Sequence, residues 1–124
     1  MMNPFLQVAI GGAFGSVARY AVYRAMPVGA SGFPVATMAV NVAGSFLMGL
    51  LTALMALRWG HAYAPLLATG VLGGFTTFSA FSLDAATLWE QGQPGAAGIY
   101  VLGSVLLCLL AVGAGLIIGR GIWA

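Results

Sequence analysis

Charged side chains are scarce in this sequence. Only 5% of its 124 residues are Asp, Glu, Lys or Arg, whereas about 25% are charged in ordinary soluble domains, and 61% are hydrophobic. This composition excludes an ordinary soluble domain and indicates a membrane protein. A helix needs about 20 apolar residues to cross the hydrocarbon core of a bilayer, so the chain has room for about four or five crossings.

Groups that could carry out catalysis are also few. The chain has one cysteine, one histidine and two acidic residues. Cys108 has no second cysteine with which to form an intrachain disulfide or a thiolate metal site. His61, Asp84 and Glu90 all fall near predicted membrane surfaces. Because no cluster for acid–base or metal chemistry forms at the membrane midplane, we do not expect an enzyme.

The positive charge is spread along the chain. The formal charge of +2 comes from four arginines without a basic cluster, so we do not expect nucleic-acid binding. With a cytoplasmic N-terminus, Arg58 and Arg120 would lie inside. Arg19 and Arg24 would lie outside, so the positive-inside rule favours neither orientation. Such a chain is a candidate for inserting both ways and pairing as an antiparallel, dual-topology homodimer. The alternative is that a partner or the burial of Arg19 fixes one orientation.

Four apolar segments predict four transmembrane helices in a single domain over residues 1–124. They cover approximately residues 4–25, 34–57, 64–90 and 95–119. Asn3 and Pro4 suit the start of the first helix as an N-cap and a first-turn proline. The glycines, threonines and serine of residues 73–79 disfavour a regular helix near the centre of the third segment. We therefore expect an all-α membrane protein whose third helix is broken at the membrane midplane.

Glycines recur at helical spacing on three of these segments. The pairs are Gly11 with Gly15, Gly70 with Gly74, and Gly115 with Gly119. This small-xxx-small pattern lets helices approach closely and fits an oligomer, although no single pair identifies its partner.

The polar side chains within the predicted spans are neutral. They are Thr37, Asn41, Ser45 and Thr52 on the second helix, Thr76, Thr77 and Ser79 on the third, and Tyr100 and Ser104 on the fourth. Such groups suit a permeant ion that is hydrogen-bonded rather than paired with a fixed charge. The amide of Asn41 needs a partner inside a membrane, so it serves either an ion or a contact between helices. Tyr100, Ser104 and Cys108 share one face of the last helix, and this stripe ends in a weak donor.

Two features of the third segment have both a functional and a structural explanation. Phe78 and Phe81 share a helix face, and the positive edges of their rings could contact a small anion, although ordinary aromatic packing explains the spacing as well. In an antiparallel dimer the two helix breaks would meet near the symmetry axis. Unwound carbonyls could hold a cation there, or the break could be a simple kink satisfied by threonine hydroxyls.

Three segments together resemble the Fluc family of fluoride channels, also called CrcB. They are residues 11–20 (GGAFGSVARY), 40–49 (VNVAGSFLMG) and 73–82 (GGFTTFSAFS), and the resemblance covers essentially the whole chain. The ordered set of three motifs is specific in a chain of this size. The chain departs from the family pattern at Phe75, at Ala80 and at Cys108, which replaces a hydroxyl on the last helix.

The resemblance implies an antiparallel homodimer in the inner or plasma membrane, with two pores that pass fluoride passively and select it over chloride. It implies that Asn41 donates to fluoride and that Phe78 and Phe81 are the pore phenylalanines. Thr77, Tyr100 and Ser104 would also belong to the pore. The carbonyls of Gly73 and Thr76 would bind a structural sodium ion at the dimer centre, and Arg19 would lie near a vestibule.

Two other functions remain open on the sequence alone. A small multidrug-type antiporter shares the size and the antiparallel dimer, but it needs an acidic residue in its first helix, where this chain has none. A non-transporting subunit of a larger membrane assembly is neither required nor excluded by Asn41, Phe78 and Phe81.

Overall fold

The computed structural model describes residues 2–124, and all regular structure in this range is helical. Four helices are long and apolar enough to cross a membrane, namely Pro4–Ala25, Val35–Trp59, Pro65–Glu90 and Pro94–Trp123. The predicted all-α architecture with four spanning helices is therefore confirmed. The last helix continues to Trp123, beyond the predicted end at residue 119.

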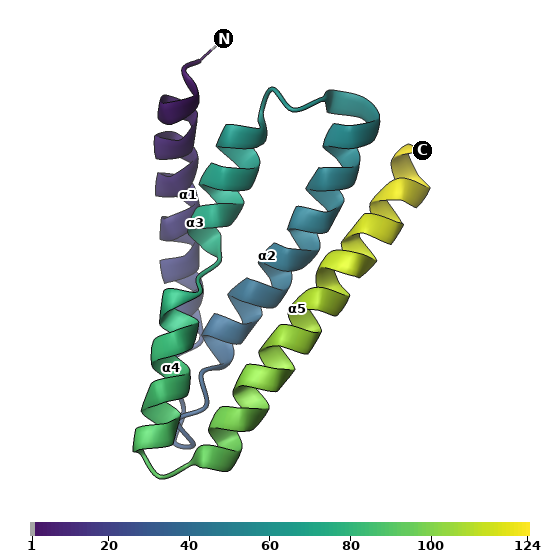
Figure 1. Cartoon of the computed structure of the whole chain (residues 1–124). Helices are drawn as coiled ribbons and strands as arrows, with labels where there is room; N and C mark the ends of the chain where they lie inside the picture. Colours follow the sequence, from purple (N-terminus) through teal and green to yellow (C-terminus); the bar gives the residue numbers. More distant parts are fainter. Residues whose placement is uncertain (1) are drawn as a thin grey trace.

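The first and last spans are the uninterrupted helices α1 (Pro4–Ala25) and α5 (Pro94–Trp123). The second consists of α2 (Val35–Leu54) and a turn of π-helix, η1 (Met55–Trp59). The third is divided into η2 (Pro65–Leu72), α3 (Gly73–Phe75) and α4 (Ser79–Glu90). Figure 1 shows that both termini and the turn between the second and third spans lie at one end of the molecule.

The break in the third span falls at residues 76–78. Thr76 has an extended backbone, with φ −91° and ψ 160°. Its amide and its hydroxyl both donate to the Leu72 carbonyl, at 3.0 and 2.9 Å. The Thr77 hydroxyl accepts a hydrogen bond of 3.1 Å from the Ala80 amide in the first turn of α4. The two threonines thus satisfy backbone groups at both ends of the break.

Glycines allow two pairs of helices to meet backbone to backbone. A Cβ placed on Gly70 of η2 would lie 2.9 Å from the Cα of Gly11 on α1. A Cβ placed on Gly115 of α5 would lie 3.1 Å from the Cα of Gly49 on α2 and 3.0 Å from the amide nitrogen of Leu50. Three of the glycines that the sequence pattern singled out therefore make contacts inside one chain.

The contact at Gly115 leads to a prediction about stability. Gly115→Ala would press a methyl group into the backbone of α2, and overpacking of this kind costs about 1–3 kcal/mol in free energy of unfolding. Reversible unfolding in mixed detergent micelles measures this loss. Gly113→Ala is the matched control, because a Cβ there meets nothing within 4 Å. Equal stability of the two variants would contradict the close approach of α2 and α5.

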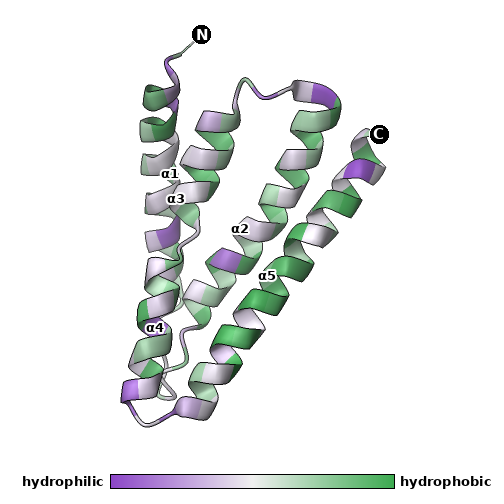
Figure 2. Cartoon of the chain, in the orientation of Figure 1, coloured by the Kyte–Doolittle hydropathy of each residue, from purple (hydrophilic) through white to green (hydrophobic). Residues whose placement is uncertain are grey.

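Much of the outer surface is apolar. Leu110 and Ile117 on α5 are 68% and 71% exposed within one chain. Figure 2 shows hydrophobic residues along most of α5, and hydrophilic ones at the helix ends and loops and in single bands within α1 and α2. This surface suits contact with lipid or with another apolar protein surface rather than with water.

Candidate functional site

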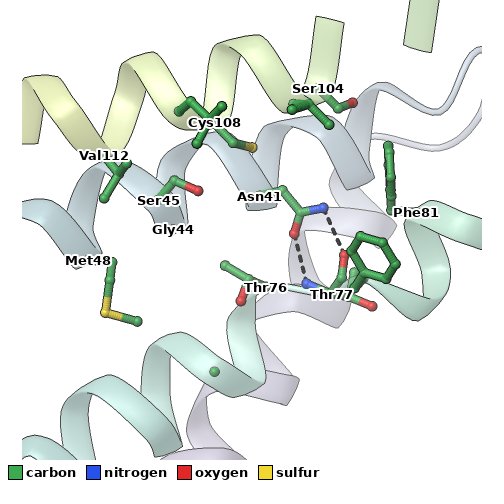
Figure 3. A pocket seen from close by; sticks show the side chains of 14 residues that line it. Asn41, Gly44, Ser45, Met48, Thr76, Thr77, Phe81, Ser104, Cys108 and Val112 are labelled. Atoms are coloured by element: carbon green, nitrogen blue, oxygen red, sulfur yellow. Dashed lines mark hydrogen bonds between the residues drawn. The ribbon is translucent and has the colours of Figure 1, made fainter. Parts of the chain in front are cut away.

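Asn41 of α2 holds the break in the third span through two hydrogen bonds. Its Nδ2 donates to the carbonyl of Thr77, and its Oδ1 accepts from the amide of Thr77, both at 2.8 Å. Figure 3 shows the two bonds as dashed lines. Because an amide nitrogen carries two hydrogens, one N–H of Asn41 remains beyond the bond to Thr77. The partner that Asn41 requires in a membrane is therefore the irregular backbone of the chain itself.

A pocket of about 560 Å³ lies beside this pair, between α2, the break and α5. We call it the Asn41 pocket. Its lining consists of Asn41, Gly44, Ser45, Met48, Gly73, Thr76, Thr77, Phe78, Phe81, Ser104, Val105, Cys108, Leu109 and Val112. Figure 3 shows these side chains converging from the helices on either side of the break. None of the lining residues carries a formal charge, so the polar groups that line the pocket are all neutral.

The two phenylalanines of the pocket have different environments. Phe81 is only 8% exposed and packs against Tyr100, with 5.2 Å between the ring centroids. Phe78 is 77% exposed, and its ring lies 5.5 Å from that of Phe81 at an angle of 55°. The core of the chain therefore fixes the Phe81 ring, whereas the Phe78 ring projects from the subunit.

The polar stripe on α5 divides into two parts. Ser104 and Cys108 line the pocket, and Ser104 is 3% exposed with a hydroxyl that has no hydrogen-bond partner within residues 2–124. Tyr100 does not line the pocket, because it is fully buried between Phe33 and Phe81. Its hydroxyl donates to Oδ2 of Asp84 at 3.1 Å.

Arg19 reaches the break from the opposite side. Its Nε donates to the carbonyl of Gly74 at 3.1 Å, and its guanidinium carbon lies 6.0 Å from the centre of the Tyr23 ring. Arg19 does not line the Asn41 pocket. Side chains of α1 and α2 thus bind the main chain on either side of residue 76.

Three carbonyl groups at the break have no hydrogen-bond donor within residues 2–124. They belong to Gly73, Phe75 and Thr76, and the first and last are the two that we expected to bind sodium. Backbone carbonyls released from a helix are suitable ligands for sodium. The free carbonyls at the break are therefore oxygen ligands of the kind that a monovalent cation takes.

The structure places most of the predicted site residues around one pocket, although reasoning from sequence missed part of its wall. Gly44 belongs to this missed part, and a Cβ there would lie 3.7 Å from the Cβ of Thr76 and 3.4 Å from the ring of Phe75. Gly44 lies one turn from Asn41 on α2 and within the second motif. This position was the sign in the sequence that Gly44 lines the same pocket. Asp84, expected near a membrane surface, lies inside α4 and meets Tyr100.

Comparison with known proteins shows the family of the chain. A family model described as "CrcB-like protein, Camphor Resistance (CrcB)" matches residues 6–116. A protein of Paracoccus denitrificans named "Fluoride-specific ion channel FluC" is 58% identical over 124 residues, which is the full length of both chains. Proteins of the same name from Cereibacter sphaeroides and Agrobacterium fabrum are 55% and 50% identical, covering 98% and 94% of this chain and 98% and 95% of their own lengths.

Proposed function

Because the chain belongs to the CrcB family, we propose that it is a fluoride-specific ion channel whose pathway includes the Asn41 pocket. It is a multi-pass protein of the bacterial plasma membrane, and it conducts ions rather than catalysing a reaction. Fluoride that has accumulated in the cytoplasm leaves down its electrochemical gradient. The observation that carries this proposal is the pocket itself, with neutral donors and phenyl rings inside a membrane-spanning bundle.

The chemistry of the pocket suits a small anion in transit. An anion that leaves water needs hydrogen-bond donors, and a pocket that conducts must not bind too tightly. Asn41 offers its second N–H, and Ser104 in the same wall has a buried hydroxyl with no hydrogen-bond partner within residues 2–124. Thr77 adds a further hydroxyl in the wall. The positive ring edges of Phe78 and Phe81 complete the solvation without a fixed positive charge.

Two predicted residues lie beyond the pocket and keep supporting roles in this proposal. Tyr100 precedes Ser104 by one turn of α5 and, fully buried, supports the pocket from behind by packing against the ring of Phe81. Arg19 places a positive charge behind the break, near one vestibule, where it raises the local concentration of anions.

The pathway is completed by a second copy of the chain in antiparallel orientation. Phe78 belongs to the pocket yet is 77% exposed, so its outer face needs a cover other than water. The balanced placement of the four arginines favours neither orientation, and this permits an antiparallel pair. Two such pockets in one dimer would form two pores.

A structural sodium ion would lie at the centre of this dimer. The carbonyls of Gly73 and Thr76 from both subunits would hold it, which brings the free carbonyls of two helix breaks together. When bound, the ion supplies positive charge that offsets the mutual repulsion of these oxygens and fixes the two breaks against each other. Arg19 and Asn41 orient the neighbouring backbone through Gly74 and Thr77.

Removal of sodium is expected to lower fluoride flux. Purification and reconstitution with N-methyl-D-glucamine in place of sodium should reduce the initial rate of efflux, and returning sodium should restore it. Fluoride-electrode recordings from proteoliposomes measure both steps. A potassium-loaded sample serves as the control for ionic strength. An unchanged rate in protein kept free of sodium throughout would contradict the cation site.

The test of the function itself is efflux from liposomes that contain the purified protein and fluoride. Valinomycin provides a potassium shunt, so passive fluoride exit becomes electrically possible. We expect rapid fluoride release without a proton gradient and much slower release of chloride. Uptake of organic cations driven by protons would indicate an antiporter instead, and absence of both activities would indicate an assembly subunit.

A further inference from the structure

A second pocket, of about 640 Å³, lies at the turn between the second and third spans. Its lining consists of Arg58, Trp59, Tyr63 and Leu67. We call it the Arg58 pocket, and it shares no lining residue with the Asn41 pocket. Figure 1 shows this turn at the end of the molecule that also carries both termini. Because one spanning helix ends at Trp59 and the next begins at Pro65, the pocket lies at the level of the lipid headgroups.

The charge of Arg58 is held in place by the chain but not neutralised by it. Its Nε donates to the carbonyl of Trp123 at 2.9 Å, which joins the end of the second span to the end of α5. A guanidinium has five N–H groups, and the other four of Arg58 make no hydrogen bond within residues 2–124. The two acidic residues of the chain, Asp84 and Glu90, both belong to α4, at the opposite end of the bundle. The free N–H groups therefore form a fixed fork, which suits the paired oxygens of a phosphate group.

The rest of the lining follows the polarity of a phospholipid from its headgroup to its acyl chains. Trp59 and Tyr63 are 56% and 50% exposed, and their ring centroids lie 6.4 Å apart in an edge-to-face arrangement. Such rings favour the boundary between headgroups and hydrocarbon. Leu67 is apolar and follows Tyr63 by one helical turn, toward the membrane interior. The pocket thus passes from a positive charge through amphipathic rings to an apolar side chain.

Both walls of the pocket are π-helical. Arg58 and Trp59 belong to η1, and Leu67 belongs to η2. The wide turn of η1 is closed by Gly60, which has a φ of 71° and whose amide donates to the carbonyl of Met55 at 2.8 Å. π-Helical turns are rare and occur frequently at functional sites. Their presence in both walls of one pocket is independent of the charge and favours a binding role.

We propose that the Arg58 pocket binds an anionic phospholipid, with its phosphate on the guanidinium and the first part of an acyl chain along Leu67. A headgroup with a net negative charge, such as that of phosphatidylglycerol, is favoured over a zwitterionic one. A zwitterionic headgroup also carries an ammonium group, and no carboxylate side chain at this end of the bundle can accept it. Basic groups close to the membrane surface attract anionic lipids. The binding does not depend on the proposed function.

Lipid binding to the full-length protein in detergent micelles tests the proposal. Native mass spectrometry counts the lipids on the protein during titration with phosphatidylglycerol, or with phosphatidylcholine that has the same acyl chains. We expect the wild type to bind the first phosphatidylglycerol about fivefold more tightly than the first phosphatidylcholine. Equal affinity for the two lipids would overturn the proposal.

A competition with inorganic phosphate distinguishes a lipid from the free anion. Phosphate at millimolar concentration should leave phosphatidylglycerol bound, because phosphate cannot use the apolar contact at Leu67. Displacement of the lipid would indicate a site for free phosphate and would overturn the lipid site.

Three variants locate the binding, with circular dichroism as a check on folding. Arg58→Gln removes the charge and should lose the preference for phosphatidylglycerol. Trp59→Glu should lose it as well, because it places a carboxylate beside Arg58, and at a position 56% exposed it disturbs little packing. Arg120→Gln is the matched control, since it removes the same charge from the same end of the molecule but lies outside the pocket lining. It should keep the preference.

The outcomes of these titrations separate the site from general electrostatics and from the channel function. A preference that survives in both pocket variants, or that Arg120→Gln loses to the same extent, would overturn the site. Because no step measures ion flux, a protein that shows the expected lipid preference but releases no fluoride from liposomes would support the lipid site and contradict the proposed function alone.

Discussion

Phe78→Ile is expected to reduce the initial rate of fluoride efflux by about tenfold to a hundredfold. An anion in the pocket would lose the electrostatic contact with one ring edge, and the expected change in rate corresponds to about 1.4–2.7 kcal/mol in the barrier. Isoleucine has similar hydrophobicity but no positive edge. Because Phe78 is 77% exposed within the subunit, the replacement removes little core packing. The loss should therefore appear in conduction with little effect on stability.

Fluoride-electrode recordings from matched proteoliposomes measure this effect, with gel filtration as a check on assembly. Phe5→Ile is the matched control, because Phe5 is 86% exposed in the first turn of α1, away from the pocket. Phe81→Ile should lose flux as well, but it also disturbs the packing against Tyr100. Normal efflux from both Phe78→Ile and Phe81→Ile would refute the pore assignment.

Asn41→Leu is expected to impair both stability and conduction. The substitution leaves the amide and the carbonyl of Thr77 without the two hydrogen bonds of 2.8 Å that they make now. Each unsatisfied buried group costs about 1–3 kcal/mol, so with two such groups the free energy of unfolding should fall by about 2–6 kcal/mol. The donor available to fluoride disappears at the same time, and efflux should drop by about a hundredfold or more.

Unfolding in mixed micelles and efflux from liposomes measure the two effects separately. Thr52→Val is the control on the same helix, because the hydroxyl of Thr52 bonds only to the carbonyl of Met48 and lies outside the pocket. Thr52→Val should change the free energy of unfolding by less than about 0.5 kcal/mol and leave the rate of efflux nearly unchanged. An Asn41→Leu protein as stable as Thr52→Val would show that the bonds to Thr77 do not hold the break.

The sequence was sufficient to predict the helical architecture, because composition and the lengths of apolar runs act locally. The break at residues 76–78 lies within the segment 73–79, whose glycines, threonines and serine predicted it. The partner of Asn41 was not predictable, since a bond between a side chain and a backbone group 36 positions away depends on how the helices pack. Sequence reasoning could state only that a partner was required.

Periodicity was informative about the face of α5 but not about what covers each part of it. Tyr100, Ser104 and Cys108 lie on one stripe, yet only the last two reach the pocket. Tyr100 is enclosed by Phe33 and Phe81 and bonded to Asp84, residues that come from the loop before α2 and from α4. A repeat along one helix contains no information about its neighbours, so this difference required the three-dimensional arrangement.

The attachment of the broken helix by Arg19 and Asn41 has a consequence for the rate at which ions pass. Arg19 and Asn41 attach residues 74 and 77 to α1 and α2, so the break at residues 76–78 is tied to both of its neighbouring helices. The donors around it are set during folding and need little reorientation when an ion arrives. Passage then has a low reorganisation energy, and a rigid, preorganised wall suits rapid turnover better than one that must adapt to every ion.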